Sequence, residues 1–491
     1  MQLFFQFLVA AVKSFQPSNR LRAFFLQKVK KRLDTKTGRF LHNPKEIVGG
    51  KSTMISSNYY YSPSSIRAGL DRAVNLVSDN IACYCTDPGI AFTRKRKMNC
   101  AALIHYLIRL SDRSVNSDLM NHYDHVEDMP SASAVCQQRY KLDSLAVKRV
   151  FRLFTDSFDN YKTYNGYYLL ACDGSDINIC HNPKDKDTYY IQTSATKGYN
   201  QLHLNALYDV LNNIYQDVYV DTAKKSNECN ALTQMIHSRQ YPDKSIIICD
   251  RGYEKYNLIA AFIENNQKFI IRVKDIGSNG ILSTLDLPNE SFDTHIRKIV
   301  TRINNSETTH NGLYAVLMNN SPFDYIDFEN EYYEMNLRVL RFKITEDTYE
   351  CLVTNLTEDE MNEDEFKVIY HLRWNEEGAF RDLKYTIGML YFHSANQELI
   401  RQEIYASLIL HNYCRFLVNN TPPPHNKKWK WRYKTNFKLA VTNIRRYMND
   451  EINEEELIRR IIKFLIPIRP GRSYSRNVRP QSCKTPSYYT A

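Results

Sequence analysis

The segment from residue 165 to residue 274 constrains the fold most, because its hydrophobic pattern alternates between strand and helix periods. Three apolar runs of strand type come first, then a helical stretch, a fully apolar run, a second helical stretch and a last run (167–172, 202–210, 214–220, 226–239, 246–249, 253–265 and 269–273). A fully apolar strand between two helices is typical of a sheet that is covered on both faces. This order predicts an α/β domain with a central mixed sheet.

The patterns on either side predict further domains around this sheet. Apolar spacing of helical type indicates an all-helical domain over 66–160. Strand-like pieces such as 337–344 and 349–354 indicate a β-rich insertion over 275–360, and helical patterning over 361–418 would complete the core. A basic segment, 1–65, precedes these domains, and a basic helical region with a disordered tail, 419–491, follows them.

The formal charge of +11 is distributed unevenly along the 491 residues. Residues 1–51 carry eleven Lys and Arg against two acids, residues 421–491 carry sixteen against five, and the middle of the chain carries 38 against 47. Basic ends suit a polyanion such as nucleic acid, and an acidic middle suits a site built from metal-binding carboxylates. The alternative is that the ends are solvated basic tails without a partner.

The cysteines indicate a reducing compartment. There are eleven, an odd number, and they follow no recurring spacing, which argues for free thiols in a cytoplasmic protein and against a secreted, disulfide-stapled one. The apolar stretch Leu3–Val12 is about half the length that spans a bilayer, and no basic region precedes it. We therefore expect neither a membrane segment nor a signal peptide.

Two aspartates stand where apolar strands are predicted to end. Asp173 follows the run 167–172 and Asp250 follows the run 246–249, and each has a glycine within two residues. Ligands of α/β sheets bind at the carboxyl ends of the strands, and carboxylates placed there suit a hard divalent cation. The alternative for either aspartate alone is an ordinary turn residue, as Asp before Gly usually is.

A helix predicted over about 363–386 carries a stripe of polar residues. On a wheel of 100° per residue that starts at Tyr370, the stripe spans about 60°, lies beside an apolar arc and contains Arg373, Glu377 and Lys384. Such a helix can pack on the sheet and still direct Glu377 towards the two aspartates. The alternative is a solvent-facing ladder in which Arg373 and Glu377 form an i,i+4 ion pair.

The spacing Tyr370-x2-Arg373-x3-Glu377-x6-Lys384 is the YREK signature, and the chain resembles the DDE transposases of the insertion-sequence-four family over about 90–418. Further motifs stand in the family's order: a basic lead-in at Ala91–Lys97, the first-aspartate motif Asp173-Gly174-Ser175, the second at Asp250-Arg251-Gly252-Tyr253, and Thr354-Asn355-Leu356 at the end of the β insertion. Glu376 departs from the family's pattern, which has an apolar residue at that position. On the wheel it falls at about 240°, inside the apolar arc.

This resemblance implies a fold, a metal site and a set of DNA contacts. The family has a ribonuclease-H-like core with a β insertion, and two aspartates and a glutamate bind two Mg²⁺ ions, for which Mn²⁺ can substitute. By similarity, Asp173, Asp250 and Glu377 would be the catalytic residues and metal ligands. The DNA contacts expected from the signature are Tyr370, Arg373, Lys384 and Trp374, and the basic run of the helical domain adds Arg94, Lys95, Arg96 and Lys97. The alternative for that run is a solvated charge cluster on a packing domain.

We therefore expect a DNA transposase that is cytoplasmic and associates with the nucleoid when it is bound to DNA. It would bind double-stranded DNA at the ends of its own insertion element as a homodimer, cut by two-metal phosphodiester hydrolysis and join the freed 3′-hydroxyl to target DNA. Two alternatives use the same features. One is a ribonuclease-H-like nuclease that cuts without joining, and the other is an inactive remnant that only binds DNA.

Overall fold

The computed structural model describes residues 61–469, except residues 95, 124, 160, 192–197, 225–226, 347 and 425–427. Three features predicted from the sequence lie outside the described residues: nearly all of the basic segment 1–65, the residue Lys95 of the basic run, and the tail from residue 470. All structural statements below concern the described part.

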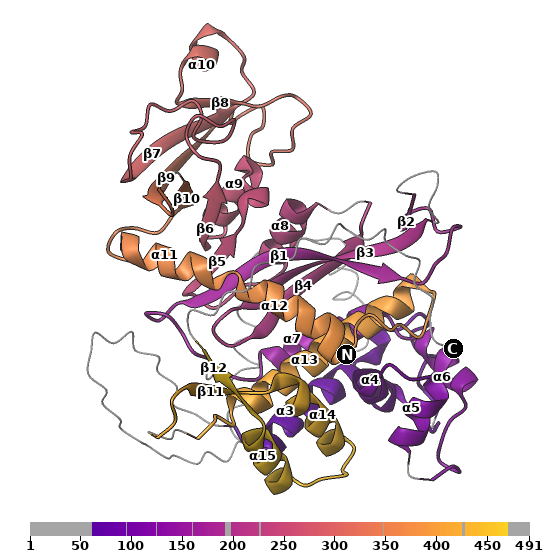
Figure 1. Cartoon of the computed structure of the whole chain (residues 1–491). Helices are drawn as coiled ribbons and strands as arrows, with labels where there is room; N and C mark the ends of the chain where they lie inside the picture. The colour runs from indigo at the N-terminus through magenta and orange to yellow at the C-terminus, as the bar shows by residue number, and fades with distance from the viewer. Residues whose placement is uncertain are drawn as a thin grey trace, which may run out of the picture. The chain divides into compact units, whose positions relative to one another are not determined.

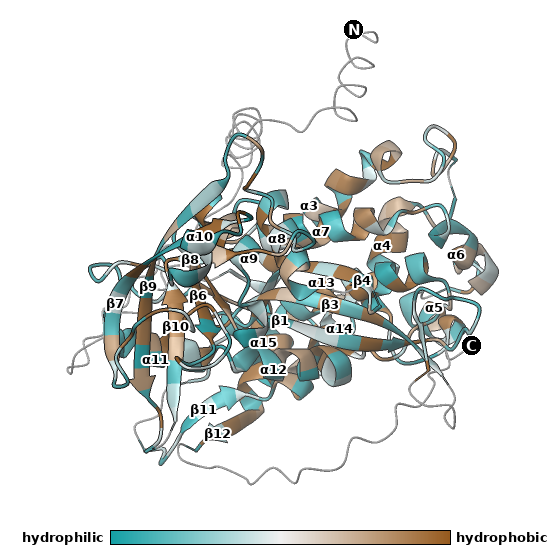
Figure 2. Cartoon of the chain, turned by 90° about the horizontal axis from the view of Figure 1, so that it is seen from above, coloured by the Kyte–Doolittle hydropathy of each residue, from teal (hydrophilic) through white to brown (hydrophobic). Residues whose placement is uncertain are grey.

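Helices fill the first hundred described residues, and a polar side chain caps the start of most of them. They are α3 (Pro63–Ser78), the 3₁₀ turn η1 (Ile81–Cys83), α4 (Cys100–Arg109), α5 (Val115–His122), α6 (Ala132–Arg139) and α7 (Ser144–Thr155). The side chains of Ser62, Asn99, Ser114, Ser131 and Asp143 accept backbone hydrogen bonds at the five α-helix starts. Figure 2 shows hydrophilic and hydrophobic residues alternating around α3 and α4, as expected of helices that bury one face.

A ten-stranded mixed sheet forms the centre (Figure 1). Its strands are β1 (Tyr168–Ile179), β2 (Tyr189–Tyr190), β3 (Tyr199–Asp209), β4 (Ile214–Thr222), β5 (Ser245–Cys249), β6 (Lys268–Val273), β7 (Phe292–Thr301), β8 (Tyr314–Val316), β9 (Tyr332–Lys343) and β10 (Tyr349–Thr354). They lie in the order β2-β3-β1-β5-β6-β10-β9-β7-β8, and β4 pairs with β3. β1, β5 and β6 run parallel to one another, whereas β3 and β10 flank them antiparallel. The prediction of an α/β domain with a central mixed sheet is confirmed.

Helices cover both faces of this sheet, as the fully apolar strand β5 requires. Successive side chains of a strand point to opposite faces. Accordingly, Ile246 and Ile248 join the hydrophobic core that contains α3, α4, α7 and α13, and Ile247 and Cys249 join the core that contains α8 (Glu228–Ser238) and α9 (Tyr256–Glu264). The long helix α13 (Gln397–Asn419) packs against both β4 and α7 and so links the N-terminal helices to the sheet.

The strands of the segment predicted as a β-rich insertion continue the central sheet. β10 pairs with β6, β9 with β10, and β7 with β9, so the sheet grows outward from its parallel centre. The short helix α10 (Ser306–His310) lies on the connection between β7 and β8. β-structure over 275–360 therefore forms one edge of the sheet that also holds the two aspartates.

The single helix predicted over about 363–386 is wrong in its continuity. The chain forms α11 (Glu363–Leu372), α12 (Asn375–Arg381) and a π-helical turn η3 (Asp382–Ile387). At the first junction the amides of Arg373 and Trp374 bond to carbonyls only three residues back, at 3.2 and 3.4 Å. The helix is wound more tightly at this junction and more loosely in the π-helical turn η3, and both change the angle per residue. A single helical wheel of 100° per residue therefore cannot describe the whole stretch.

The C-terminal region contains helices, as predicted, and a small antiparallel sheet of two strands. Its elements are β11 (Arg432–Thr435), α14 (Phe437–Met448), α15 (Glu454–Lys463) and β12 (Leu465–Ile468), and β11 pairs with β12. α14 packs against α13 and α15. This region is therefore attached to the same helical layer as the N-terminal helices.

Candidate active site

Asp173 and Asp250 lie side by side on adjacent parallel strands. The last rung between β1 and β5 joins Cys172 to Cys249, so each aspartate is the residue that follows this rung. β5 ends at the rung, but β1 continues to Ile179, and the expectation that the first strand ends before Asp173 is wrong. The strand is longer than its apolar run because β3 pairs with it over the whole length, including Asp173 opposite Ala206.

Short hydrogen bonds hold both carboxylates close to their own backbone. An oxygen of Asp173 accepts from the amide of Gly174 at 2.9 Å, and an oxygen of Asp250 accepts from the amide of Gly252 at 2.7 Å. Beneath them the thiol of Cys172 lies 3.5 Å from the hydroxyl of the buried Tyr253. The two carboxylates therefore stand on rigid backbone above an apolar floor.

The pKa of Asp173 is raised from 3.8 to about 6. Burial is the largest cause, the amide of Gly174 and the guanidinium of Arg373 oppose it, and the charges of Asp250 and Glu228 raise it further. Like charges that raise a pKa at the carboxyl end of parallel strands are typical of a site that gains a cation.

Glu228, at the start of α8, is a third carboxylate at this place, and sequence reasoning missed it. A Cβ atom at Gly174 would overlap a carboxylate oxygen of Glu228, and one at Gly252 would stand 3.9 Å from the other oxygen. Gly174 thus leaves the space into which Glu228 reaches, whereas Gly252 lies at an ordinary contact distance from it. The signal was present only indirectly, in the glycine after Asp173, because nothing in the spacing of Glu228 itself marks it.

His203 of β3 connects Glu228 to Asp176 of β1. Its Nδ1 lies 2.8 Å from an oxygen of Asp176, and its Nε2 lies 3.2 Å from an oxygen of Glu228. Burial opposes the charge of His203, but the hydrogen bonds to the two carboxylates outweigh it and raise the pKa from 6.5 to about 9. The imidazolium therefore fixes Glu228 beside the aspartate pair.

Tyr370 and Arg373 are buried beside the aspartates. Nη1 of Arg373 lies 4.0 Å from an oxygen of Asp173, and the residue is only 5% exposed. Its guanidinium also stacks over the rings of Trp374 and Tyr370, at 4.9 and 5.8 Å from their centroids. Trp374 itself is 45% exposed, so this aromatic face is open to solvent next to the acidic pair.

Lys384 reaches β1 just beyond Asp173. Its ammonium donates to the hydroxyl of Ser175 at 2.8 Å and to the carbonyl of Asp176 at 2.7 Å. Two residues of the signature, Arg373 and Lys384, therefore contact one stretch of β1, although the helix that carries them is interrupted. Figure 1 shows α12 lying beside β1, in agreement with the packing of these two elements.

The two consecutive glutamates of α12 have opposite environments. Glu377, the predicted third ligand, is exposed on the first turn of α12. Glu376 is completely buried, as its place in the apolar arc predicted, and burial raises its pKa well above the usual range. Among the described residues no group of three or more His, Cys, Asp and Glu side chains is arranged as a metal site. The structure thus brings Asp173 and Asp250 to the ends of neighbouring strands and leaves Glu377 at the surface.

Comparison with known proteins identifies the family. The model of the transposase DDE domain matches residues 164–413, which are 250 of the 491 residues and include the aspartate pair and the YREK residues. This chain belongs to the DDE transposase family. A solved structure that is similar is the "piggyBac transposase synaptic complex with hairpin DNA", at 12% identity and a TM-score of 0.37, over 84% of this chain and 87% of that one. A search of curated proteins found no match.

The carboxylates of this DDE transposase suit the divalent metal ions that its family generally uses. Asp173, Asp250 and Glu228 supply oxygen donors of the kind that hard cations prefer. Both oxygens of Glu376 are buried without a hydrogen-bond partner, and Arg373 is the positive charge nearest to Asp173 among the ion pairs of the described residues. The aspartate pair thus offers two carboxylates to a cation, and no third His, Cys, Asp or Glu side chain of the described residues completes a metal site there.

The basic run of this family member lies on the surface of the helical segment. Arg94, Arg96 and Lys97 are exposed, and the ammonium of Lys97 donates to the carbonyl of Glu127. The connection between α3 and α4 carries them. Among the described helices, none combines the length and the hydrophobicity needed to cross a bilayer.

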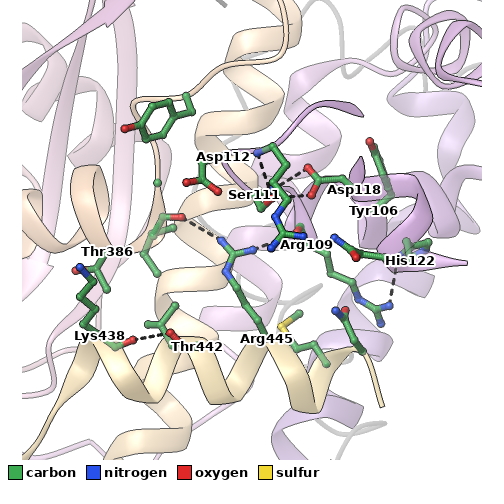
Figure 3. Close-up of a pocket in the computed structure, with 18 of the residues that line it drawn as sticks. Tyr106, Arg109, Ser111, Asp112, Asp118, His122, Thr386, Lys438, Thr442 and Arg445 are labelled. Atoms are coloured by element: carbon green, nitrogen blue, oxygen red, sulfur yellow. Dashed lines mark hydrogen bonds between the residues drawn. The ribbon is translucent and has the colours of Figure 1, made fainter. Parts of the chain in front are cut away.

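A cavity of about 630 Å³ lies elsewhere, between α4, α5, η3 and α14 (Figure 3). Arg445 of α14 lines it and donates to the carbonyls of Arg109, Leu110 and Ile387 at 3.0 to 3.1 Å. On the opposite side Asp118 accepts from the backbone and the hydroxyl of Ser111. Neither aspartate of the pair lines this cavity. Arg445 in its lining already donates its hydrogen bonds to backbone carbonyls. We therefore place the chemistry at the aspartate pair.

Proposed function

We propose that this chain is a DNA transposase that binds the ends of its own insertion element, cleaves them and joins the freed 3′-hydroxyl to target DNA. The observation that carries the proposal is that Asp173 and Asp250 each follow the last parallel rung, Cys172 with Cys249, with Arg373 4.0 Å from Asp173, inside the segment that matches the family. The core that we infer is ribonuclease-H-like, and the YREK spacing favours the insertion-sequence-four branch of the family.

The proposed chemistry uses Asp173, Asp250 and Glu377 as ligands. Two Mg²⁺ ions, when bound, would activate a water or a 3′-hydroxyl and stabilise the oxygen that leaves phosphorus. In the first step the P–O3′ bond breaks, water supplies the new P–O bond and the 3′-oxygen leaves as a hydroxyl. In the second step that hydroxyl attacks a target phosphodiester, so one P–O bond replaces another and no covalent protein intermediate is needed.

The other signature residues have roles that follow from their positions. Arg373 can exchange its ion pair with Asp173 for two parallel hydrogen bonds to a phosphate, because a guanidinium suits bidentate contact. Lys384 adds a point charge next to Ser175, and Tyr370 lies behind Arg373. The half-exposed ring of Trp374 can stack on an unpaired base.

We infer a homodimer on DNA, because joining requires two ends to be held together, and a cytoplasmic protein that associates with the nucleoid through that DNA. The basic run Arg94, Arg96 and Lys97 is exposed and suits the phosphate backbone. Lys95 belongs to the same proposal, although it lies outside the described residues.

A cleavage assay tests the proposal. The substrate is a plasmid that carries the DNA flanking the gene, the cofactor is Mg²⁺, and the proteins are the wild type, Glu377→Gln and the control Asp364→Asn, whose carboxylate is 92% exposed one helix earlier. We expect cleavage at the element ends by the wild type and the control, none by Glu377→Gln, and similar gel shifts for all three. Cutting without strand-transfer products would favour a nuclease, and gel shifts without any cutting would favour an inactive remnant.

A further inference from the structure

The two-stranded sheet of β11 and β12 is a short ribbon with one face open to solvent. The two strands pair only with each other, and no other described element packs extensively against them. One rung joins Arg432 to Ile468 and another joins Lys434 to Ile466, and side chains that face each other across a rung lie on the same face. These four side chains are exposed, whereas those of the other two rungs are partly buried. Figure 2 shows the hydrophilic β11 beside the more hydrophobic β12.

The chain that builds this ribbon is basic and contains no acid. Residues 421–448 carry eight Lys and Arg, residues 457–469 carry four, and neither range contains Asp or Glu. Among the described residues, neither Arg432 nor Lys434 has an ion-pair partner. The open face therefore presents two cations that the protein itself does not neutralise.

The acids of the C-terminal region do not compensate for these charges, because each of the five has another partner. Four form ion pairs and the fifth accepts a hydrogen bond from a backbone amide. The pairs are Asp450 with Arg67, Glu451 with Arg446, Glu455 with Arg459 and Glu456 with Arg460, and Glu454 accepts from the amide of Ser64. The ribbon thus keeps a positive local field.

Aromatic side chains brace the ribbon where the chain enters it. The ring of Trp429 packs edge-on against Tyr433, with the two centroids 4.6 Å apart, and the ammonium of Lys430 lies 5.4 Å from the centroid of Trp431. Tyr433 belongs to the partly buried face. The aromatic contact therefore supports the ribbon from behind and leaves the face of Arg432 and Lys434 open.

We propose that the β11–β12 ribbon is a further DNA-binding surface, and that its open face contacts double-stranded DNA. The major groove of DNA admits a two-stranded β-ribbon. Arg432 and Lys434 can then reach phosphates, while Ile466 and Ile468 pack against thymine methyl groups. The inference rests on the proposed function, since it concerns the same DNA. It adds a contact that neither the signature residues nor the basic run of the helical segment contains.

Fluorescence anisotropy of the full-length protein tests the inference without cleavage. The probe is a labelled duplex of the DNA that flanks the gene, in EDTA and at several salt concentrations. The variant Arg432→Ala/Lys434→Ala is compared with the control Arg446→Ala/Arg459→Ala, which removes the same charge from two arginines that are paired within the protein. We expect the ribbon variant to lower the salt slope by about two units and to weaken binding about tenfold or more at about 0.1 M salt, and the control to keep the slope of the wild type.

Two further measurements exclude a folding defect and a different occupant. The ribbon variant should melt within about 2 °C of the wild type, because its two side chains are exposed and unpaired. Ile466→Lys/Ile468→Lys should bind the duplex more tightly and with a steeper salt slope, because it places two more cations on the same face. Sedimentation of the DNA-free protein should be the same for the wild type and both ribbon variants.

The outcomes separate this inference from the proposed function. A wild-type salt slope for Arg432→Ala/Lys434→Ala overturns the inference and leaves the proposed function standing. Unchanged DNA binding together with altered sedimentation would make the ribbon a contact between two copies of the chain, which also overturns it. If the wild type does not bind the duplex even at low salt, both proposals fall. If the ribbon variant loses DNA binding as expected but the wild type cuts no DNA in the cleavage assay, only the proposed function falls.

Discussion

The buried Arg373 stands 4.0 Å from the partly exposed Asp173, at the carboxyl end of the parallel strand pair. In this arrangement one guanidinium lies against a carboxylate that we propose as a metal ligand, and it stacks on an exposed tryptophan. An arginine that is held by a displaceable ion pair is ready for phosphate as soon as another cation takes over the carboxylate.

The raised pKa of Asp173 predicts that the stability of the metal-free protein depends on pH. Its folded-state pKa of about 6 exceeds the ordinary 3.8, so between these values the folded state keeps a proton that the unfolded state has lost. Stability of the metal-free protein should therefore fall as pH rises from about 4 to about 6 and then level off. Asp173→Asn should be more stable than the wild type by about 1–3 kcal/mol at pH 7 and no more stable at pH 3.5.

Urea denaturation in EDTA at the two pH values measures this difference. If the free energies of unfolding of the wild type and Asp173→Asn differ by the same amount at both pH values, the raised pKa assigned to Asp173 is wrong.

Gly174 should not accept a side chain. A Cβ atom there would overlap Glu228 and His203, so Gly174→Ala should lower the free energy of unfolding by about 1–3 kcal/mol. The matched control is Gly378→Ala in α12, where a Cβ meets nothing within 4 Å and alanine should stabilise the helix by about 0.5–1 kcal/mol. Equal stability of the two variants in chemical denaturation would show that Glu228 is not packed against Gly174.

The buried ion pair of Arg139 and Glu403 should contribute more to the stability of the fold than exposed ion pairs do. It links α6 to α13 at 2.6 Å with both side chains at most 5% exposed, so Arg139→Ala should cost about 3–5 kcal/mol by leaving a buried charge. The control, Arg459→Ala, breaks an i,i+4 pair with Glu455 that is about 70% exposed and should cost less than about 0.5 kcal/mol. Calorimetric melting of both variants gives the comparison, and similar losses would contradict it.

Lys384 should contribute both to structure and to DNA binding. Lys384→Ala removes two hydrogen bonds to β1 and, if the ammonium also contacts a phosphate, should lower the salt slope of binding to element ends by about one unit. Lys367→Ala is the control, because that ammonium pairs with Glu363 and Asp364 of its own helix. An unchanged slope together with a lower melting temperature would leave Lys384 with a structural role only.

The sequence predicts this protein well where the signal is local. The strand 349–354 is found at Tyr349–Thr354, and the fully apolar run 246–249 is found within Ser245–Cys249, because burial on both faces is written into consecutive residues. The aspartates are found next to each other because parallel neighbours end at the same edge of a sheet.

The features that sequence reasoning missed depend on contacts between distant segments. β1 extends past Asp173 because β3 supplies partners there, and Glu228 enters the site because Gly174 leaves it room. The helix expected over 363–386 is broken at Arg373, whose side chain is anchored against Asp173 two hundred residues earlier. The hydrophobic pattern of one segment does not predict such contacts with distant segments.

The pairing of Val273 with Cys351 on one rung of β6 and β10 has a consequence for the segment between them. The chain leaves the central strands after Val273 and returns to them at Cys351, so the segment between is an insertion whose two ends are held next to each other. Its length can change without moving β1, β5 or the aspartates, because the ends of a loop remain closed at little entropic cost as the loop grows. The segment between Val273 and Cys351 can therefore be lengthened or shortened while the strands that carry the aspartates keep their places.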